Sequence, residues 1–554
     1  MVESEVDVLV VGGALGGLST AMFLAQRGVR VLLAERHGTT SLHRKAAGLN
    51  PRTMELLRIG GVLGRIREAA DDRGDRGSRG DFGIKVAETV GGPVLRSVAE
   101  GLDDIVRETE QCSPQRWTPA GQDRIEPVLR KQAEAYGATI RFGTELVSFE
   151  HSDDAGVTAR LRDLEDGAEH TVRARYLVAA DGPRSTIRES LGVTRHGHGS
   201  LAHFMTIVFD ADLSTVLPPG AAGWYYLRNP AFSGTFGPAG RPGRYSLYVR
   251  YAPEQGESAE DFTPQRCLEL IRLAVNAPDL RAELVETQPW EMAARIADRW
   301  RVGRVLLVGD AAKVMPPTGG MGGNTAIGDG FDVAWKLAAV LRGEAGEALL
   351  DSYAEERSGI ARLVSGEALS LYADRMAPQL ADSVPEKLGN ARVLLGFRYR
   401  SGAVAEPDDI AAASDTGSGA GVGSGDELTE DPLRPSGRAG FRAPHGWVER
   451  DGGERRSVLD LFGDGWVLLA APGGARWSAA ATRAARELGV PLDAHTLGDG
   501  LVDTDAVLAS RYGIGAAGAS LVRPDGVVAW RTADAPSDGA AGTLRSVLTR
   551  VLAR

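Results

Sequence analysis

The stretch VDVLVVGGALGGL at residues 6–18 decides the fold. Its first half is a short run rich in β-branched residues, and a cluster of glycines follows at once. This pattern predicts a buried parallel strand over residues 6–11, a tight glycine turn and a helix over residues 18–27. A second apolar run at residues 29–35 predicts the next strand and ends at Glu35. The stretch therefore predicts a βαβ unit at the start of an α/β chain.

A glycine turn between a strand and a helix favours the pyrophosphate of a dinucleotide, because free N–H groups and the helix dipole both attract an anion. Gly12 and Gly17 fit the outer positions of G-x-G-x-x-G, but Ala14 occupies the middle one, where a methyl group crowds the phosphate. Glu35 has the spacing of a carboxylate that binds ribose hydroxyls. The residues predicted to bind the cofactor here are Gly12, Gly13, Ala14, Leu15, Gly16, Gly17, Glu35 and Arg36.

This loop alone leaves a turn without a ligand as the alternative. The strict G-x-G-x-x-G motif of the chain lies elsewhere, at residues 513–518. It precedes a strand pattern instead of following one, so it predicts a turn and no cofactor site.

The composition is that of an ordinary globular protein, with 554 residues, 43% hydrophobic and 25% charged. A net charge of −11 argues against a nucleic-acid partner. Two cysteines, Cys112 and Cys267, exclude a disulfide framework and a cysteine-built metal site, so no metal is expected. The acidic N-terminus lacks the positive region of a signal peptide, and no apolar run could span a membrane. These features predict a cytoplasmic protein.

The chain is predicted to contain several domains. Residues 403–430 are rich in Gly, Ala, Ser and Asp, which is typical of a flexible linker. Strand-like alternation without glycine motifs marks an inserted unit. The predicted ranges are 1–71, 105–191 and 288–402 for a discontinuous first domain, 72–104 and 192–287 for the inserted substrate domain, 403–430 for the linker and 431–554 for the C-terminal domain.

Two further segments carry a resemblance. They are YLVAADGPRSTIR at residues 176–188 and GRVLLVGDAAKVMPPTGGMGGNTAIGDGFDVAWKL at residues 303–337. With the glycine loop, in this order and spacing, they resemble the class A flavoprotein monooxygenases of the para-hydroxybenzoate hydroxylase fold. GWYYL at residues 223–227 and RMAP at residues 375–378 are similar, more narrowly, to anthracycline hydroxylases of the aklavinone 11-hydroxylase type.

The resemblance implies a Rossmann-like, GR2-type FAD-binding domain that is discontinuous, with an inserted mainly-β substrate domain. ASLVRPDGVVAWR at residues 519–531 also resembles the thioredoxin-like appendage of phenol and polyketide hydroxylases. A redox role for that domain would need C-x-x-C, and neither cysteine lies after residue 267. The expected C-terminal domain is therefore structural or an interaction surface.

The resemblance also implies which side chains contact FAD. Asp310 is expected to hydrogen-bond the ribityl chain, Gln122 the phosphate or ribityl region, and Asp181 both FAD and the nicotinamide region. The backbone at Leu146 is expected to meet adenine. Amides at a helix N-terminus beside the flavin would stabilise negative charge on the reduced ring. The segment expected beside the flavin ring contains Pro317, Gly320, Met321, Gly322, Gly323 and Asn324.

The sequence departs from the family pattern at three places. Lys45, preceded by Arg44, replaces a usual Arg and loses its bidentate fork. Lys313 stands where many relatives have His and is interpreted as a phosphate-side or surface lysine. Asp332 replaces a frequent Asn.

The implied reaction begins when NADPH or NADH, bound transiently, reduces FAD. Dioxygen then forms a flavin C4a-hydroperoxide, which hydroxylates an aromatic, anthracycline-like polyketide in antibiotic biosynthesis. Tyr226 and Arg375 are the catalytic candidates that would favour ionisation of a substrate phenol. Strand alternation puts Trp224 and Tyr226 on one face and Tyr225 on the other. A packing tyrosine and a surface arginine are the alternatives.

Other functions stay open on the same scaffold. They are Baeyer–Villiger oxidation, inactivation of an antibiotic, and a non-catalytic flavin-binding interaction module. The intact GD segment argues against the last of these, and the missing W-x-W-x-I-P segment disfavours a halogenase. The expected partners are an aromatic polyketide and dioxygen, with no nucleic acid or membrane, and the chain is expected to be a monomer or homodimer.

Overall fold

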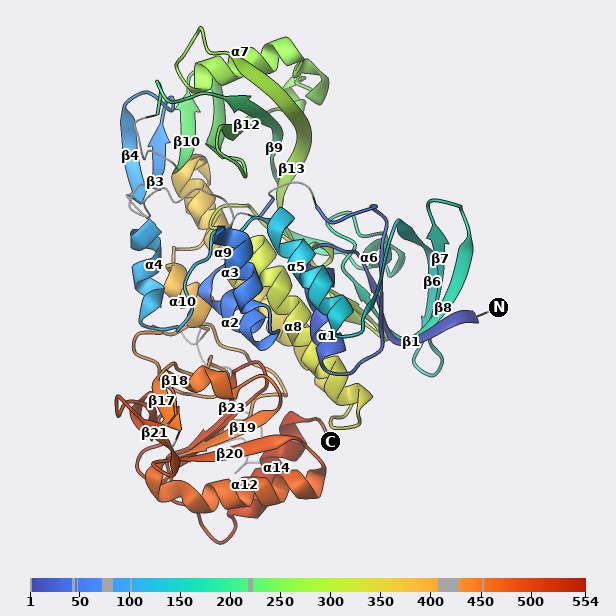
Figure 1. Cartoon of the computed structure of the whole chain (residues 1–554), viewed down its shortest axis with the longest axis vertical. Coiled ribbons are helices and arrows are strands. Elements are labelled where there is room, and N and C mark those ends of the chain that lie inside the picture. Colours follow the sequence, from blue (N-terminus) through green and yellow to red (C-terminus); the bar gives the residue numbers. More distant parts are fainter. Residues whose placement is uncertain are drawn as a thin grey trace.

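The structure is a computed structural model that describes residues 2–41, 45–46, 48–71, 83–99, 102–217, 223–406, 428–450 and 453–554. Figure 1 shows a central body of helices and sheet, with one β-rich unit above it and the C-terminal domain below it. Within the described part of the chain, no helix combines the length and apolar character that a membrane span requires.

The first sheet contains the predicted βαβ unit. β1 (Val2–Val11) pairs in parallel with β2 (Val31–Glu35), and α1 (Leu15–Gln26) connects them. The strand order is β14-β15-β8-β1-β2-β5, with β6 and β7 joined to β8. Its other strands are β5 (Thr139–Phe142), β6 (Thr144–Ser152), β7 (Gly156–Asp163), β8 (Glu169–Ala179), β14 (Arg301–Val302) and β15 (Val305–Leu307). The α/β prediction is therefore confirmed.

The second sheet has the order β16-β13-β9-β12-β11-β10-β3-β4. One face packs on α7 (Pro264–Ala274) through an apolar cluster, and the opposite face meets α9 (Leu349–Arg375). Its strands are β3 (Gly83–Ala87), β4 (Val94–Ala99), β9 (Arg195–Ala211), β10 (Gly223–Asn229), β11 (Phe232–Pro238), β12 (Arg244–Tyr251), β13 (Ala282–Ala297) and β16 (Lys313–Val314). This sheet is the upper unit in Figure 1.

Helix α8 (Met321–Leu341) runs through the centre of the molecule and packs on α1 and α9. It is buried along most of its length because both neighbours cover it. The remaining α-helices of this part are α2 (Pro51–Ile59), α3 (Leu63–Asp71), α4 (Leu102–Glu110), α5 (Gln122–Ala135), α6 (Thr186–Ser190) and α10 (Asn390–Leu395). Short 3-10 helices are η2 (Pro253–Gln255), η3 (Ala259–Asp261), η4 (Gly309–Ala311) and η5 (Pro378–Ser383).

The C-terminal domain has its own sheet, ordered β18-β17-β21-β20-β19-β22-β23, on which α12 and α14 pack together. Its strands are β17 (Trp447–Arg450), β18 (Arg456–Ser457), β19 (Trp466–Ala470), β20 (Leu492–Leu497), β21 (Gly500–Asp503), β22 (Ala519–Val522) and β23 (Val528–Thr532). Its helices are η7 (Val458–Leu461), η8 (Pro472–Gly474), α12 (Ala475–Leu488), α13 (Leu508–Arg511) and α14 (Ala540–Val551).

The strict glycine motif at residues 513–518 is a turn between α13 and β22, as predicted. Most of the predicted linker, residues 407–427, lies outside the described residues. The described ends of that stretch pack against folded structure, since Ala405 donates its N–H to the Ala529 carbonyl and Glu430 donates to Gly396.

Candidate flavin and substrate site

The loop between β1 and α1 keeps its shape only with glycine at two positions. A Cβ atom at Gly17 would lie 1.8 Å from the Gly12 carbonyl oxygen, and one at Gly12 would lie 2.2 Å from the Ala180 carbonyl oxygen. Gly12 also has a φ of 109°, which L side chains rarely adopt. These close approaches bring the loop against the segment that contains Asp181.

Helix α1 begins at this loop without a capping side chain. Its N-cap residue is Ala14, and its first turn holds no acidic residue. Ala14 is exposed, whereas Leu15, Gly16 and Gly17 behind it are buried. Because the first N–H groups of a helix have no intrahelical partner, this N-terminus offers donors to an anion. The geometry fits the pyrophosphate of a dinucleotide.

Glu35 lies at the end of β2, directly beside the loop. Its carboxylate accepts the N–H of Gly13 at 2.5 Å and the N–H of His37 at 2.8 Å. Both hydrogen bonds hold the carboxylate at the carboxyl edge of the parallel strands, where a ribose is bound in this type of fold. Arg36 follows and is exposed.

The DG and GD segments come together at the same edge of the sheet. β8 and β15 pair in parallel with Ala179 opposite Leu307, so Asp181 and Asp310 follow two neighbouring strands. Oδ2 of Asp181 accepts the N–H of Ile187 at 3.2 Å, while its buried Oδ1 has no hydrogen-bond partner among the described residues. An acceptor left open in this way fits a ligand that donates a hydroxyl hydrogen bond.

The Asp310 side chain is exposed, although many protein atoms lie near its carboxyl group. Burial raises the pKa of its carboxyl, and the charges of Lys313 and Lys45 act in the opposite direction. An exposed carboxylate at this edge of the sheet can accept hydrogen bonds from more than one ribityl hydroxyl.

The segment that precedes α8 presents an open helix N-terminus. Gly320 is the N-cap, with a φ of 64° and no side-chain cap. Pro317 and Gly320 are exposed, Met321 is buried beneath them, and a Cβ atom at Gly320 or Gly322 would meet nothing within 4 Å. A Cβ atom at Gly323 would lie 2.9 Å from Leu15 Cδ1, so the first turns of α8 and α1 are neighbours.

Asn324 connects this segment to neighbouring residues by three hydrogen bonds. Its side-chain amide donates to the carbonyls of Gly320 at 2.8 Å and Gly48 at 3.0 Å, and its Oδ1 accepts the N–H of Asn50 at 2.9 Å. Asn50 caps α2 through its own side chain and was not singled out from the sequence. The N-P-R-T start of a helix was the signal that could have identified it.

The remaining predicted cofactor residues lie on α5, on β6 and in the segment before α2. Gln122 begins α5, and its backbone N–H donates to the Ala46 carbonyl at 3.0 Å, next to the exposed Lys45. Leu146 lies near the start of β6, and Gly143 just before it donates to the His37 carbonyl at 2.9 Å. Arg44 lies outside the described residues.

Tyr226 and Arg375, which are 149 positions apart, are in direct contact. Nη1 of Arg375 donates to the Tyr226 hydroxyl at 3.0 Å, and the side chains are 8% and 9% exposed. A surface position for Arg375 is therefore wrong. Its buried Nε has no hydrogen-bond partner among the described residues, so one donor is left for a ligand.

The strand alternation around Tyr226 is as predicted. Tyr225 packs with Phe236 in the cluster under α7, whereas Tyr226 lies on the opposite face, toward α9. On that second face the rings of Trp224 and Tyr248 lie 6.2 Å apart, and Tyr248 lies 6.4 Å from Trp290. These half-buried aromatic rings can pack against a planar polycyclic ligand. Arg375 ends α9, and α10 follows it before residue 403.

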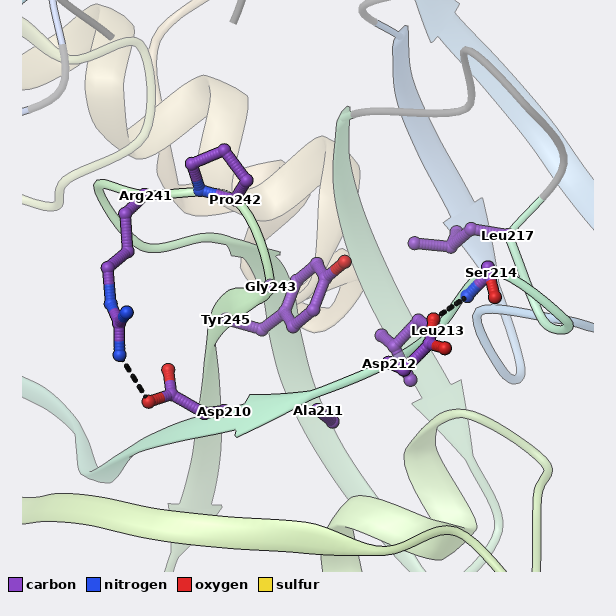
Figure 2. A pocket seen from close by; sticks show the side chains of 10 residues that line it. All are labelled: Asp210, Ala211, Asp212, Leu213, Ser214, Leu217, Arg241, Pro242, Gly243 and Tyr245. Carbon is purple, nitrogen blue, oxygen red and sulfur yellow. Dashed lines mark hydrogen bonds and ion pairs between the residues drawn. The ribbon is translucent and has the colours of Figure 1, made fainter. Parts of the chain in front are cut away.

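A wide hollow lies away from these motifs. It has a volume of about 700 Å³ and is lined by the end of β9 and the start of β12, with an ion pair between Arg241 and Asp210 at 2.6 Å (Figure 2). It contains none of the predicted cofactor or catalytic residues, so its size alone does not mark it as the flavin site.

The interpretation of Lys313 as a phosphate-side or surface lysine is wrong. It is 2% exposed and forms a short ion pair with Asp329, which Arg357 also binds at 2.8 Å. A full charge at this depth needs such partners, because desolvation would otherwise dominate. Charged residues inside the apolar sequence of α8 were the signal that could have revealed the group.

Comparison with known proteins agrees with this geometry. The family described as "FAD binding domain" matches residues 5–368, and "Aromatic-ring hydroxylase, C-terminal" matches residues 436–554. Aklavinone 12-hydroxylase DnrF of Streptomyces peucetius subsp. caesius is 64% identical over 486 residues, which cover 88% of this chain and 95% of that protein. Aklavinone 12-hydroxylase RdmE of Streptomyces purpurascens is 58% identical, with 100% of both chains covered.

A solved structure gives the same assignment. Aklavinone-11 hydroxylase, crystallised as a ternary complex with FAD and aklavinone, superposes with a TM-score of 0.92 at 57% identity, and 100% of each chain is covered. The matched family is defined by FAD binding, and the predicted FAD motifs lie together at one edge of the first sheet. The chain therefore belongs to the class A FAD-dependent aromatic monooxygenases, in the branch that contains the aklavinone hydroxylases.

Proposed function

We propose that this enzyme hydroxylates an aromatic ring of an anthracycline-type polyketide, of which aklavinone is the test case, using dioxygen and NADPH or NADH. The relatives named above carry aklavinone in their names, and one was crystallised with it. The observation that carries the proposal in this chain is the buried contact between Tyr226 and Arg375 on the α9-facing side of the second sheet.

Bound FAD supplies the activation of dioxygen, and the chain supplies binding, position and electrostatics. The N-terminus of α1 and Glu35 would hold the pyrophosphate and ribose, and Asp310 the ribityl chain. The open N-terminus of α8 would stabilise negative charge on the ring system. All these groups lie at or beside the ends of helices and strands, which supports a shared cofactor site.

Tyr226 and Arg375 would manage the proton of a substrate phenol. Because Arg375 donates to the Tyr226 oxygen, the tyrosine proton can point toward another acceptor, such as a substrate oxygen. The same guanidinium charge favours the phenolate form of the substrate, in which the ring carbon is more nucleophilic. When an oxygen atom replaces the ring hydrogen, the tyrosine can hold or relay the released proton.

The proposed architecture has a GR2-type, Rossmann-like FAD domain at residues 1–71, 105–191 and 288–402, with a substrate domain at residues 72–104 and 192–287. The C-terminal domain at residues 431–554 is proposed to be thioredoxin-like. Its parallel β19–β20 pair with α12, and its antiparallel β22–β23 pair with α14, support this assignment. Without cysteines in this region of the sequence, it would have no thiol redox role.

The proposal is tested with aklavinone, NADPH and ¹⁸O₂, and the product is analysed by mass spectrometry and NMR. One labelled oxygen and the loss of one aromatic proton signal are expected. A ring-opened ester or lactone that keeps all aromatic protons would instead show Baeyer–Villiger oxidation. Turnover of the finished glycosylated antibiotic but not of aklavinone would indicate an inactivating enzyme, and no substrate-stimulated NADPH oxidation would contradict catalysis on this class.

A further inference from the structure

A network of buried charges joins the C-terminal domain to the flavin-binding part of the molecule. Each member is at most 5% exposed. The network contains equal numbers of acidic and basic groups, so it is neutral when all are ionised. Its ion pairs form two groups, which meet at Tyr399: the Tyr399 hydroxyl accepts a hydrogen bond from Arg357 at 2.8 Å, and the Arg523 guanidinium lies 5.3 Å from the centre of the Tyr399 ring. The first group contains Lys313, Asp329 and Arg357, and the second contains Asp332, Lys336, Glu356, Arg523 and Asp525.

Arg523 is the residue of the C-terminal domain that pairs with α9 in this network. It follows β22, is 0% exposed, and contacts Glu356 of α9 with two hydrogen bonds of 2.6 and 2.8 Å. Lys336 of α8 binds Glu356 at 2.7 Å and Asp332 at 2.6 Å. Figure 1 shows this geometry at the level of the fold, with the C-terminal domain lying below α8 and α9.

Arg357, the next residue on α9, leads toward the flavin side. Its Nε donates to Asp329 at 2.8 Å, and its Nη2 donates to the Thr325 carbonyl at 3.2 Å, near the start of α8. The other oxygen of Asp329 accepts the N–H of Gly309 at 3.2 Å. Gly309 immediately precedes Asp310, so the network ends at two segments that border the flavin site.

We propose that Arg523 is a positioning residue for the flavin site and acts through this network on α8 and on the Gly309–Asp310 backbone. Without Arg523, Glu356 and Asp332 share Lys336 as their remaining close basic partner. Arg357 is the nearest guanidinium along α9, and the uncompensated carboxylates would draw it away from Asp329 and the Thr325 carbonyl. The GD segment and the first turns of α8 would then loosen.

The charge balance predicts a pH dependence for this effect. Burial raises the pKa of Asp332 to about 6, and Lys336 and Arg523 both oppose that rise. Removal of Arg523 therefore raises the pKa further, and Asp332 takes up a proton at mildly acidic pH, which restores neutrality. The charged or titratable groups that interact with Asp332 are Lys336, Tyr353, Glu356, Arg357, Tyr399, Arg523 and Asp525.

The experiment measures release of FAD from the holoenzyme after dilution, by the rise in flavin fluorescence, at pH 6 and pH 8. Arg523→Met is expected to release FAD about 5- to 30-fold faster than the wild type at pH 8, and with a smaller difference at pH 6. Arg523→Lys should recover part of the loss because it returns the charge without the bidentate geometry.

Arg442→Met is the matched control. Arg442 also reaches from the C-terminal domain into a buried ion pair, with Glu55 of α2, but contacts none of the described charged side chains of α8 or α9. Its release rate should stay within about twofold of the wild type. Equal acceleration in both variants would mean that simple domain docking is responsible and would overturn the proposal, as would unchanged release in Arg523→Met.

Two further variants keep the test decisive. Arg523→Met combined with Asp332→Asn restores equal numbers of charges, so its release rate should lose the pH dependence of the single variant. If Arg523→Met does not fold, Asp332→Asn alone is compared with the wild type between pH 5 and pH 7. A flat profile in the variant against a sloping wild-type profile supports the proposal, and identical profiles overturn it.

Discussion

The proposed flavin side and the proposed substrate side of this enzyme are built in different ways. On the flavin side, Gly12, Asp181 and Asp310 each follow one of the parallel strands of the first sheet, and each lies in a short recognisable motif. On the substrate side, Tyr226 comes from β10 and Arg375 from the end of α9, and their contact joins two elements without a shared motif.

The difference shows which kind of site a local pattern can specify. Parallel strands bring their carboxyl ends to one edge, so motifs at those ends must converge. A residue on a strand face and a residue at a helix end converge only through the packing of that helix on that sheet. Substitutions in the first arrangement should weaken FAD binding, whereas substitutions in the second should lower turnover and leave FAD binding intact.

The largest effect is expected from Asp310→Ala, which removes the proposed acceptor for the ribityl hydroxyls of FAD. Loss of charge-assisted hydrogen bonds worth about 1.5–3 kcal/mol each should weaken FAD binding by at least tenfold or leave the protein colourless. FAD titration of the apoprotein measures this. Asp212→Ala, in the separate hollow of Figure 2, is the control and should bind FAD normally. Near-normal affinity in Asp310→Ala would contradict the assignment.

Tyr226→Phe and Arg375→Gln should affect the proposed substrate side. Both should bind FAD normally and lose hydroxylation by about 10-fold or more, which is the scale of acid–base assistance. Their rates should recover partly as pH rises, because the substrate phenol then ionises unaided. Turnover against pH is measured with Tyr225→Phe as the control, since Tyr225 packs under α7. Damage confined to Tyr225→Phe would reverse the assignment of faces.

Asp332→Asn should increase stability at neutral pH. The folded protein raises the pKa of Asp332 to about 6. Ionised Asp332 therefore lowers the free energy of unfolding of the wild type. This loss is absent below about pH 4, grows as pH rises, and is complete above about pH 6. The variant should gain about 1–3 kcal/mol near pH 7 and nothing near pH 4.

Unfolding of the holoenzyme in denaturant at both pH values measures that difference. Glu356→Gln is the contrasting variant, because neighbouring Arg523 and Lys336 overcome burial and lower the Glu356 pKa to about 2. That group stabilises the fold above about pH 4.5 and loses its contribution as pH falls toward 2. Glu356→Gln should therefore destabilise at pH 7, and stabilisation by both substitutions would contradict the charge assignment.

The smallest effect is expected from Ala14→Gly, which relieves a methyl group beside the expected pyrophosphate. FAD affinity should stay the same or rise slightly, as seen by titration. Gly515→Ala tests the strict motif in the C-terminal turn, where φ is 57°. Strain there should cost stability without changing FAD affinity. A large loss of FAD affinity in Ala14→Gly would contradict the expected relief of crowding, and a large loss in Gly515→Ala would show that the C-terminal motif was rejected wrongly.

Much of the flavin side followed from the sequence alone. The βαβ unit, the order of the three motifs and the rejection of residues 513–518 all rest on interactions between near neighbours in the chain. Strand alternation also separated Tyr225 from Tyr226, because successive side chains of a strand must point to opposite faces. The predicted start of the first helix was wrong, because α1 begins at Leu15 and not at residue 18. Gly16 and Gly17 pack closely within its first turn, where a larger side chain would not fit.

Only the tertiary structure decided the rest. It placed Arg375 on Tyr226, buried Lys313 against Asp329, and paired Arg523 of the C-terminal domain with Glu356 of α9. A charged side chain looks the same in the sequence whether it is solvated or buried, because its state depends on partners from distant segments. Desolvation makes an unpaired buried charge costly, so these residues could be assigned only when their partners were known.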